Sequence, residues 1–364
     1  MHQVIKYIDE CPPVKGFRRS AIYDLHRNTC QFIPNSMFDI LKNIEGKSIE
    51  EVSLEFGSDP IIDEYVEFLV SNEYILLCDA EDYLNFPSLS FEFAGPSTIS
   101  SACLAFEHPS SYDLASCINQ LENLGCRHFL LIAETVMPIQ YFTALLSSFQ
   151  HSSILSIDIY AKFNPATSLE DIHAFCGNPF RIRSFLQYSA PSDQFIPTGN
   201  DGFNAVIFVR QSIDTKKANF QNIQDYFSIN MQSYCEAQRT NLFYNKKILI
   251  DSKGIISGGQ NPSINSVNVN TTSVLDAINA PGFSETWGVN KDLIEVCREC
   301  EYRYMCPDDR IPVKCKGGGW KQETECFYNP FIAKWKGEEG YLPLSETREY
   351  LDMYKDEAVH EIYR

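Results

Sequence analysis

Strands and helices alternate along residues 98–211, and this alternation restricts the possible folds more than any other feature of the chain. Runs rich in β-formers, such as TISSACLAFE at 98–107 and HFLLIAE at 128–134, are separated by amphipathic helical patterns such as YDLASCINQLENLG at 112–125. Strands that are connected through helices pair in parallel, which predicts an α/β domain on a parallel sheet. The number of repeats is nearer five or six than eight, so we predict a partial (β/α) barrel over residues 96–242.

The sequence of residues 1–80 predicts a small α+β domain that is distinct from the partial barrel. Three short runs rich in β-formers, QVIKYI, RSAIYDL and TCQFIP, are followed by helical patterns at 35–46, 48–57 and 60–72. The run YILLC at 74–78 then predicts a closing strand. Strands followed by three short helices and a wing are typical of a winged helix.

The charge of the chain argues against nucleic acid as a partner. Its 48 acidic and 30 basic residues give a formal net charge of −18, which repels a phosphate backbone. No apolar run reaches the roughly 18 residues that cross a membrane, and the start MHQVIKYIDECPP lacks a basic stretch leading into an apolar one. We therefore expect no membrane span, no signal peptide and a cytoplasmic location, where thiols stay reduced.

The thirteen cysteines fall into two groups. Five lie within thirty residues near the end of the chain, which in a reducing compartment argues for a metal site rather than disulfides. Cys297 and Cys300 have the two-residue spacing that lets one turn present two sulfurs to one ion, and Cys306 adds a third. The fourth ligand comes from Cys315 or Cys326, and four thiolates suit both zinc and an iron–sulfur cluster. The other eight stand alone, and we interpret them as small hydrophobic residues of the core: Cys11, Cys30, Cys78, Cys103, Cys117, Cys126, Cys176 and Cys235.

The cysteine spacing resembles that of a known domain. C-x2-C-x5-C followed by a later cysteine resembles the second half of the SPASM domain, a C-terminal extension of many radical-SAM peptide-modifying enzymes. The whole chain resembles the SPASM-domain peptide maturase of grasp-with-spasm systems, which make graspetides, a class of ribosomally synthesised and post-translationally modified peptides (RiPPs). Four segments carry the likeness: RSAIYDLHRNTCQFIPNSMFDIL, KKILIDSKGII, WGVNKDLIEVCRECEYRYMCPDDR and CFYNPFIAKW.

This resemblance implies how the chain is divided. Residues 1–80 look like a PqqD-like RiPP recognition element, the winged helix that holds leader peptides, and residues 81–95 look like a linker. Residues 96–242 look like a degenerate radical-SAM partial barrel, and residues 243–364 look like a SPASM domain that keeps one metal site of four cysteines. The resemblance implies the ligands Cys297, Cys300, Cys306 and Cys326, with Cys315 as a substitute for the last.

The chain departs from this family at residues that carry its chemistry. No C-x3-C-x2-C occurs, and the strand at 98–107 runs through HPSS into a helix at Tyr112. Without three thiolates there is no open iron, so we expect no S-adenosylmethionine binding and no radical-SAM catalysis. Two more cysteine positions of the SPASM pattern hold other residues. Gly258 and Gly259 lie at the one shortly after the hairpin, and Arg310 lies at the one four residues after Cys306. One site of three remains, and we expect it to hold Zn²⁺ or [4Fe-4S] in a structural role.

Peptide binding is expected in the first domain. An extended leader would pair with the third predicted strand and lie against the third helix. The residues that we expect to contact it are Cys30, Gln31, Phe32, Ile33, Ile61, Tyr65 and Phe68. The alternative is a winged helix that only packs on the barrel. DNA binding is disfavoured because the third helix, IIDEYVEFLVSN, carries acids and no Lys or Arg.

Two functions follow from these features. The first is a non-catalytic adaptor for RiPP maturation, which binds a ribosomal precursor peptide and presents it to an ATP-grasp ligase. The second is a peptide-modifying iron–sulfur oxidoreductase of the radical-SAM/SPASM class. The missing C-x3-C-x2-C favours the adaptor, so we expect a pseudoenzyme rather than an enzyme.

Overall fold

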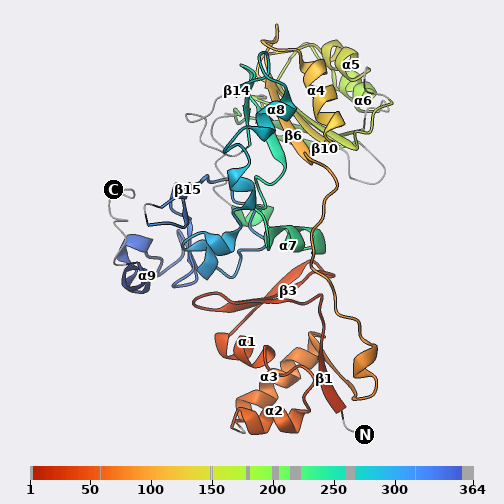
Figure 1. Cartoon of the computed structure of the whole chain (residues 1–364). Coiled ribbons are helices and arrows are strands. Elements are labelled where there is room, and N and C mark those ends of the chain that lie inside the picture. The colour runs from red at the N-terminus through yellow and green to blue at the C-terminus, as the bar shows by residue number, and fades with distance from the viewer. Residues whose placement is uncertain are drawn as a thin grey trace. The chain divides into compact units, whose positions relative to one another are not determined.

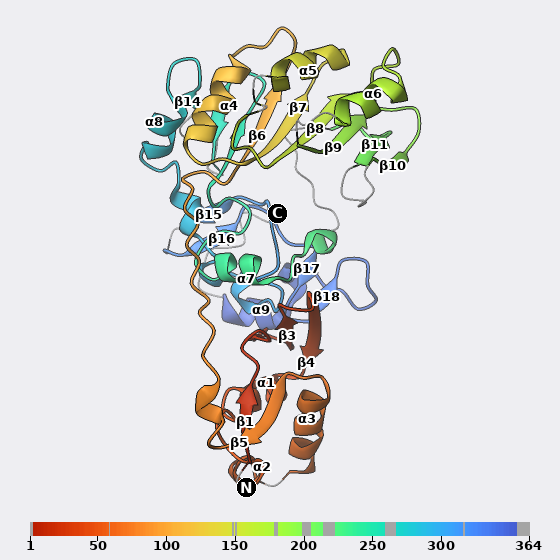
Figure 2. The same cartoon turned by 90° about the vertical axis from the view of Figure 1, so that its right-hand side faces the viewer.

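The protein forms two compact units in a computed structural model (Figures 1 and 2). We describe residues 3–57, 59–147, 149, 151–177, 181–198, 205–213, 223–258, 267–315 and 317–354. The first unit contains the described residues of Met1–Phe93, Gln221–Leu242 and Val289–Arg364. The second contains those of Ala94–Phe220 and Phe243–Gly288.

The N-terminal part of the first unit has two small antiparallel sheets and three helices. Strands β1 (Gln3–Tyr7) and β5 (Ile75–Asp79) pair with each other. Strands β2 (Pro13–Val14), β3 (Ser20–Asp24) and β4 (Thr29–Ile33) form the second sheet in that order. The helices are α1 (Asn35–Leu41), α2 (Ile49–Glu55) and α3 (Pro60–Ser71), followed by the 3-10 turn η1 (Tyr83–Asn85). These elements confirm the order that the sequence predicts, apart from β2, which it does not predict.

Local sequence explains where these helices begin. Ser48 and Glu51 form a capping box at the start of α2, and Asp59 caps α3, whose first residue is Pro60. The buried residues of α3 are spaced three and four apart: Ile62, Tyr65, Val66 and Leu69. Ile61 lies outside this stripe and is 41% exposed, so Ile62 is the core residue at the start of the helix.

The C-terminal part of the first unit is built mostly from turns. Its helices are α7 (Met231–Ala237) and α9 (Arg348–Met353), with 3-10 turns η2 (Ile223–Tyr226), η4 (Lys291–Leu293), η5 (Cys297–Glu299) and η6 (Leu344–Glu346). Its strands form two short antiparallel pairs, β15 (Pro312–Lys314) with β16 (Trp320–Gln322) and β17 (Tyr328–Asn329) with β18 (Lys334–Trp335). A segment with so little regular structure depends on side-chain contacts to keep its shape.

The second unit is a mixed α/β domain with a large, mostly parallel sheet. The strand order is β10-β11-β9-β8-β7-β6-β12-β13-β14, in which the six strands from β11 to β12 are parallel. The parallel strands are β6 (Ser101–Phe106), β7 (His128–Ala133), β8 (Ser156–Lys162), β9 (Ile182–Tyr188), β11 (Ala205–Val209) and β12 (Lys247–Ile250). Antiparallel strands complete both edges: β10 (Gln194–Pro197), β13 (Ile255–Ser257) and β14 (Val267–Asn268).

Helices cover one face of this sheet. They are α4 (Leu114–Asn123), α5 (Ile139–Ser147), α6 (Leu169–Cys176) and α8 (Val274–Asn279), with the 3-10 turn η3 (Glu285–Gly288). One hydrophobic core joins these helices to alternate residues of the strands, for example Leu104, Leu131 and Ile159. Within the described residues the sheet ends at β10 and β14 and does not close, as the small number of repeats predicts.

The hairpin at 246–258 belongs to the sheet of the second unit. Strands β12 and β13 pair antiparallel around a turn that ends at Gly254, whose φ of 81° favours glycine. Strand β12 also pairs in parallel with β6, so it continues the sheet. Residues 243–288 therefore pack with the predicted barrel, and residues 289–354 pack with the N-terminal domain.

Among the residues that we describe, no helix is long and apolar enough to cross a membrane.

Candidate functional site

Five cysteines lie in or beside the irregular loop that follows η4. Cys297 begins η5, and the turn from Cys300 leads to Cys306. Cys315 directly follows strand β15, and Cys326 lies two residues before strand β17. All five are half-buried.

Four of these thiols act on one another electrostatically. Burial raises the pKa of Cys297, and Cys326 raises it further. Burial also raises the pKa of Cys300 well above its usual range, with Cys306 and Cys326 adding to the effect. The pKa of Cys306 is likewise raised by burial and by Cys326 and Cys297. Cys326 therefore affects all three cysteines of the C-x2-C-x5-C motif, whereas the Sγ of Cys315 lies 3.2 Å from a carboxylate oxygen of Glu295.

Two backbone N–H groups donate to sulfur atoms of this group. The N–H of Tyr302 donates to Cys300 Sγ and the N–H of Tyr328 donates to Cys326 Sγ, each at 3.4 Å. Burial raises the pKa of Cys300, and the bond from Tyr302 partly offsets that rise. Hydrogen bonds to sulfur are a feature of metal-bound thiolates, because they stabilise negative charge on the ligand.

Two cations, the buried Lys291 and the half-buried Arg310, lie beside the thiols. Burial raises the pKa of Cys297, while Lys291 and Arg310 lower it. Both cations bind the carboxylate of Asp308, with Lys291 Nζ at 2.6 Å and Arg310 Nη2 at 2.7 Å. Although burial favours the neutral form of Asp308, Arg310 and Lys291 hold its pKa below its usual range. Lys291 and Arg310 would offset part of the negative charge of metal-bound thiolates, while the carboxylates of Asp308 and Glu301 act in the opposite direction on Cys297 and Cys300.

The chemistry of this donor set fits a metal that binds four thiolates. A cavity lined by Cys297, Cys326 and Arg310 lies against the group. As the side chains are placed, however, no group of three or more His, Cys, Asp or Glu residues in the described part of the chain could hold a metal ion. The four-cysteine site therefore stays a prediction, supported by the mutual effects of the four thiols and by their cationic surroundings.

The positions where the resemblance would place further cysteines make other contacts. A Cβ at Gly258 would lie 2.6 Å from the ring of Phe283, and the indole N–H of Trp287 donates to the Gly258 carbonyl at 2.9 Å. Arg310 is held by its bonds to Asp308. Gly259 lies outside the described residues.

The segment where a C-x3-C-x2-C motif would stand contains no cysteine. Strand β6 ends at Phe106 and helix α4 begins at Leu114, and the residues between them are EHPSSYD. Cys103 lies within the strand itself, and burial raises its pKa to about 12, so its thiol is neutral at pH 7. Of the eight isolated cysteines, Cys11, Cys117, Cys126 and Cys235 are buried as predicted, and the other four are half-buried.

Strand β4 is the outer strand of its sheet, and its free edge can be assigned from the pairing of β3. The N–H groups of Tyr23 and Leu25 donate to the carbonyls of Pro12 and Glu10, on the side away from β4. The intervening residues of β3 therefore bond to β4, and these include Ile22, which pairs with Gln31. Consequently the backbone N–H and C=O groups of Cys30 and Phe32 point outward.

This outward edge is open in the described structure. No backbone hydrogen bond between described residues reaches the N–H of Cys30 or of Phe32. The carbonyl of Phe32 accepts only a long bond of 3.4 Å from the side chain of Gln31 in the described part of the chain. An edge with unused donors and acceptors is a template for an added strand.

Helix α3 flanks the two ends of β4. The hydroxyls of Ser36 and Tyr65 lie 2.8 Å apart just beyond the C-terminal end of the strand. Arg27, in the turn before the strand, pairs with Glu73, just beyond the C-terminal end of the helix. The helix therefore runs alongside the strand in the opposite direction.

The residues expected to contact a peptide divide into surface and core positions. Gln31, Phe32 and Ile61 are exposed, and Cys30 and Phe68 are half-buried. Ile33 and Tyr65 belong to the core of the N-terminal domain, so they support the strand and helix from inside. The exposed and half-buried positions are the ones that remain available for contact.

Two residues of this region have no counterpart in any sequence motif. Arg19, in the loop before β3, and Glu301, between two of the cysteines, form an ion pair at 2.6 Å although 282 positions separate them. Glu301 is completely buried, while the Arg19 side chain is partly exposed. Sequence spacing carries no signal for such a pair, because neither residue belongs to a periodic pattern.

Comparisons with known proteins give a distant structural likeness. No family model and no curated protein matches the chain. Among solved structures it is similar to Streptococcus suis SuiB bound to S-adenosylmethionine, with a TM-score of 0.35 and 10% identity over 88% of this chain and 95% of that one. It is also similar to SuiB alone, with a TM-score of 0.29 and 11% identity over 90% of this chain and 98% of that one. SuiB bound to the precursor peptide SuiA gives a TM-score of 0.28 and 10% identity over 89% of this chain and 96% of that one.

Proposed function

We propose that this chain is a non-catalytic adaptor of RiPP maturation, which binds the leader of a ribosomal precursor peptide and presents it to an ATP-grasp ligase. The open edge of β4 is the observation that carries this proposal. Its outward groups at Cys30 and Phe32 offer two donors and two acceptors to an extended peptide. Each backbone bond to an added strand contributes about 1 kcal/mol net, and pockets beside the edge add specificity.

The surroundings of the edge suit a peptide with apolar side chains. Phe32, on the strand itself, is 37% exposed, and an exposed apolar side chain next to unused backbone groups suits strand addition. Ile61, at the start of α3, is 41% exposed and would meet a peptide beyond the C-terminal end of the strand. Helix α3 contributes Asp63, Glu64 and Glu67 and no basic residue to this region, which disfavours nucleic acid.

The four-cysteine site serves as structural support in this proposal. Cys297, Cys300, Cys306 and Cys326 would hold one Zn²⁺ or one [4Fe-4S] cluster, which would cross-link an irregular loop and so contribute to its folding. The packing at Gly258 and the ion pairs of Arg310 support a single site. The alternative is a peptide-modifying iron–sulfur oxidoreductase. A single zinc, or no metal, after anaerobic purification would exclude it, whereas brown protein with four irons would be compatible with both functions.

Peptide binding can be tested with the full chain and synthetic peptides that tile the short open reading frames beside its gene. Phe32→Pro removes an outward N–H from β4, and Phe32→Ala removes the same ring but keeps that N–H. We expect at least about fivefold weaker binding for the proline variant than for the alanine variant, which corresponds to one hydrogen bond of about 1 kcal/mol. Circular dichroism checks that both variants are folded.

N-methylated peptides provide an independent test of strand addition. If the leader adds a strand, N-methylation of its backbone should weaken binding at every second position, because alternate N–H groups face β4. A uniform response along the peptide, or equal affinities of Phe32→Pro and Phe32→Ala, would refute strand addition at this edge. A pull-down with the neighbouring ATP-grasp ligase, with and without peptide, tests the presentation step.

A further inference from the structure

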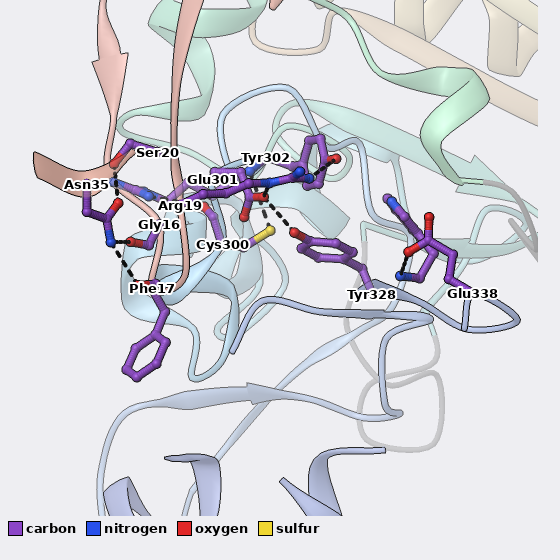
Figure 3. A network of polar contacts seen from close by, with 12 residues as sticks. Gly16, Phe17, Arg19, Ser20, Asn35, Cys300, Glu301, Tyr302, Tyr328 and Glu338 are labelled. Carbon is purple, nitrogen blue, oxygen red and sulfur yellow. Dashed lines mark hydrogen bonds and ion pairs between the residues drawn. The ribbon is translucent and has the colours of Figure 1, made fainter. Parts of the chain in front are cut away.

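The N-terminal domain is tied to the cysteine loop by one network of polar contacts (Figure 3). The N–H of Phe17 donates to the carbonyl of Glu299 at 2.8 Å, and Arg19 Nε donates to the carboxylate of Glu301 at 2.6 Å. The hydroxyl of Tyr23 donates to the carbonyl of Glu301 at 2.5 Å. Strand β3 and the loop before it are thus fixed to the residues that lie between the thiols.

Glu301 is the centre of this network and is linked to two of the thiol segments. It directly follows Cys300, and its Oε1 also accepts from the hydroxyl of Tyr328 at 2.5 Å. Tyr328 is the residue whose N–H donates to Cys326 Sγ. A single buried carboxylate therefore joins the Cys300 segment, the Cys326 segment and Arg19 of the N-terminal domain.

Gly16 also shows that the turn before β3 packs closely against Glu301. A Cβ at Gly16 would lie 2.4 Å from the carbonyl oxygen of Arg19 and 3.0 Å from Glu301 Cβ. Only glycine leaves room for the turn to approach the cysteine loop this closely. Asn35 holds the same turn from the other side, where its side-chain amide donates to the carbonyls of Gly16 and Phe17.

The network reaches the outward edge of β4 through Phe32. The guanidinium carbon of Arg19 lies 3.7 Å from the centre of the Phe32 ring, and the ring of Tyr302 lies 5.5 Å from it, edge to face. Arg19 Nη2 also donates to the hydroxyl of Tyr302 at 3.0 Å. Phe32 carries one of the two outward N–H groups, so the cysteine loop helps to set the position of the strand that we propose binds the peptide.

We propose that Glu301 is a positioning residue that couples the thiol site to strand β4, so that metal and peptide bind cooperatively. The inference rests on the proposed function for both its peptide and its metal. Cys300 and Cys326 would hold the metal together with Cys297 and Cys306, and a bound metal would fix the Cys300 and Cys326 segments, on which Glu301 and Tyr328 contact each other and Glu301 contacts Arg19. Because linkage is reciprocal, bound peptide raises zinc affinity by the same factor by which zinc raises peptide affinity.

Hydrogen exchange tests the coupling without any peptide. Full-length reduced protein is compared after loading with Zn²⁺ and after chelation. We expect amides of residues 20–33 to exchange about tenfold faster after chelation, because the loop that supports β3 and β4 loosens, while β1 and β5 change little. Equal exchange of residues 20–33 in the two forms would overturn the inference, as would a failure of the protein to bind either zinc or a [4Fe-4S] cluster.

Glu301→Gln tests the carboxylate itself. Zinc-loaded Glu301→Gln should keep its zinc but show faster exchange in residues 20–33 and at least about fivefold weaker peptide binding. Glu299→Gln removes the same charge two residues away, where the side chain pairs with Arg298 instead, and should behave as wild type. If Glu301→Gln does not fold, Tyr302→Phe provides a milder test, because it removes only the hydroxyl that accepts from Arg19.

The outcomes separate this inference from the proposed function. If no peptide binds but residues 20–33 respond to zinc, the coupling stands and the peptide function fails. If peptide binds with the same affinity in the zinc-loaded and chelated forms, and exchange is unchanged, the coupling fails and the peptide function stands. Wild-type behaviour of folded, zinc-loaded Glu301→Gln would also overturn the role of Glu301.

Discussion

Replacing Asp308 with Asn should destabilise the first unit far more than replacing Lys291 with Met. Asp308 is 1% exposed and accepts hydrogen bonds from Lys291, Arg310 and Gln322. The Asn variant keeps the shape of the side chain but removes the only negative charge of the triad. The buried ammonium of Lys291 and the half-buried guanidinium of Arg310 then lose the carboxylate that both bind.

The size of the effect follows from what each change leaves behind. Removing one partner of a buried ion pair costs about 3–5 kcal/mol, because the remaining charge stays desolvated. In Lys291→Met the Asp308–Arg310 pair remains balanced, so the loss is nearer that of one hydrogen bond, about 1–2 kcal/mol. For domains of about 150–250 residues each kcal/mol lowers Tm by about 2–4 °C, which gives about 10 °C for Asp308→Asn and about 4 °C for Lys291→Met.

The assay is thermal unfolding of the full chain by calorimetry, with chelator and reductant so that no metal contributes. Asp309→Asn is the matched control, since it removes a charge at the next residue. Burial and the neighbouring Asp308 raise the pKa of Asp309 to about 6, so its charge is already disfavoured in the folded state and its loss should cost little. If Asp308→Asn melts no lower than Lys291→Met, the triad does not stabilise the fold as we argue.

Three further predictions concern the thiols, the barrel and a helix end. Cys326→Ser should abolish metal binding measured by elemental analysis, whereas Cys315→Ser should keep one metal site per chain; the reverse result would make Cys315 the ligand. Calorimetry should detect no S-adenosylmethionine binding, and micromolar affinity would contradict the pseudoenzyme proposal. Gly125→Ala should lower the free energy of unfolding, measured by chemical denaturation, by about 1–3 kcal/mol, because Gly125 has a φ of 87° and a Cβ would lie 2.8 Å from Ser97 Cβ. An unchanged denaturation midpoint would contradict this.

The amino-acid sequence alone determined the order of elements and identified the cysteine cluster, whose metal binding stays a prediction. Alternation of strand and helix patterns over 98–211 predicted the mostly parallel sheet, and the helical pattern at 48–57 predicted α2. These features are local: periodicity, capping and turn preferences act over a few residues and can be read without knowledge of the fold. The same applies to the C-x2-C-x5-C spacing, which a single turn presents.

Only the tertiary structure decided which distant residues meet. It identified Cys30 and Phe32 as the outward positions of β4, because that depends on how β3 pairs with β2. It also paired Arg19 with Glu301 across 282 positions and packed Phe283 against Gly258. Such contacts arise from the shape complementarity of whole surfaces, and no local pattern encodes them, because each residue alone is compatible with many surroundings.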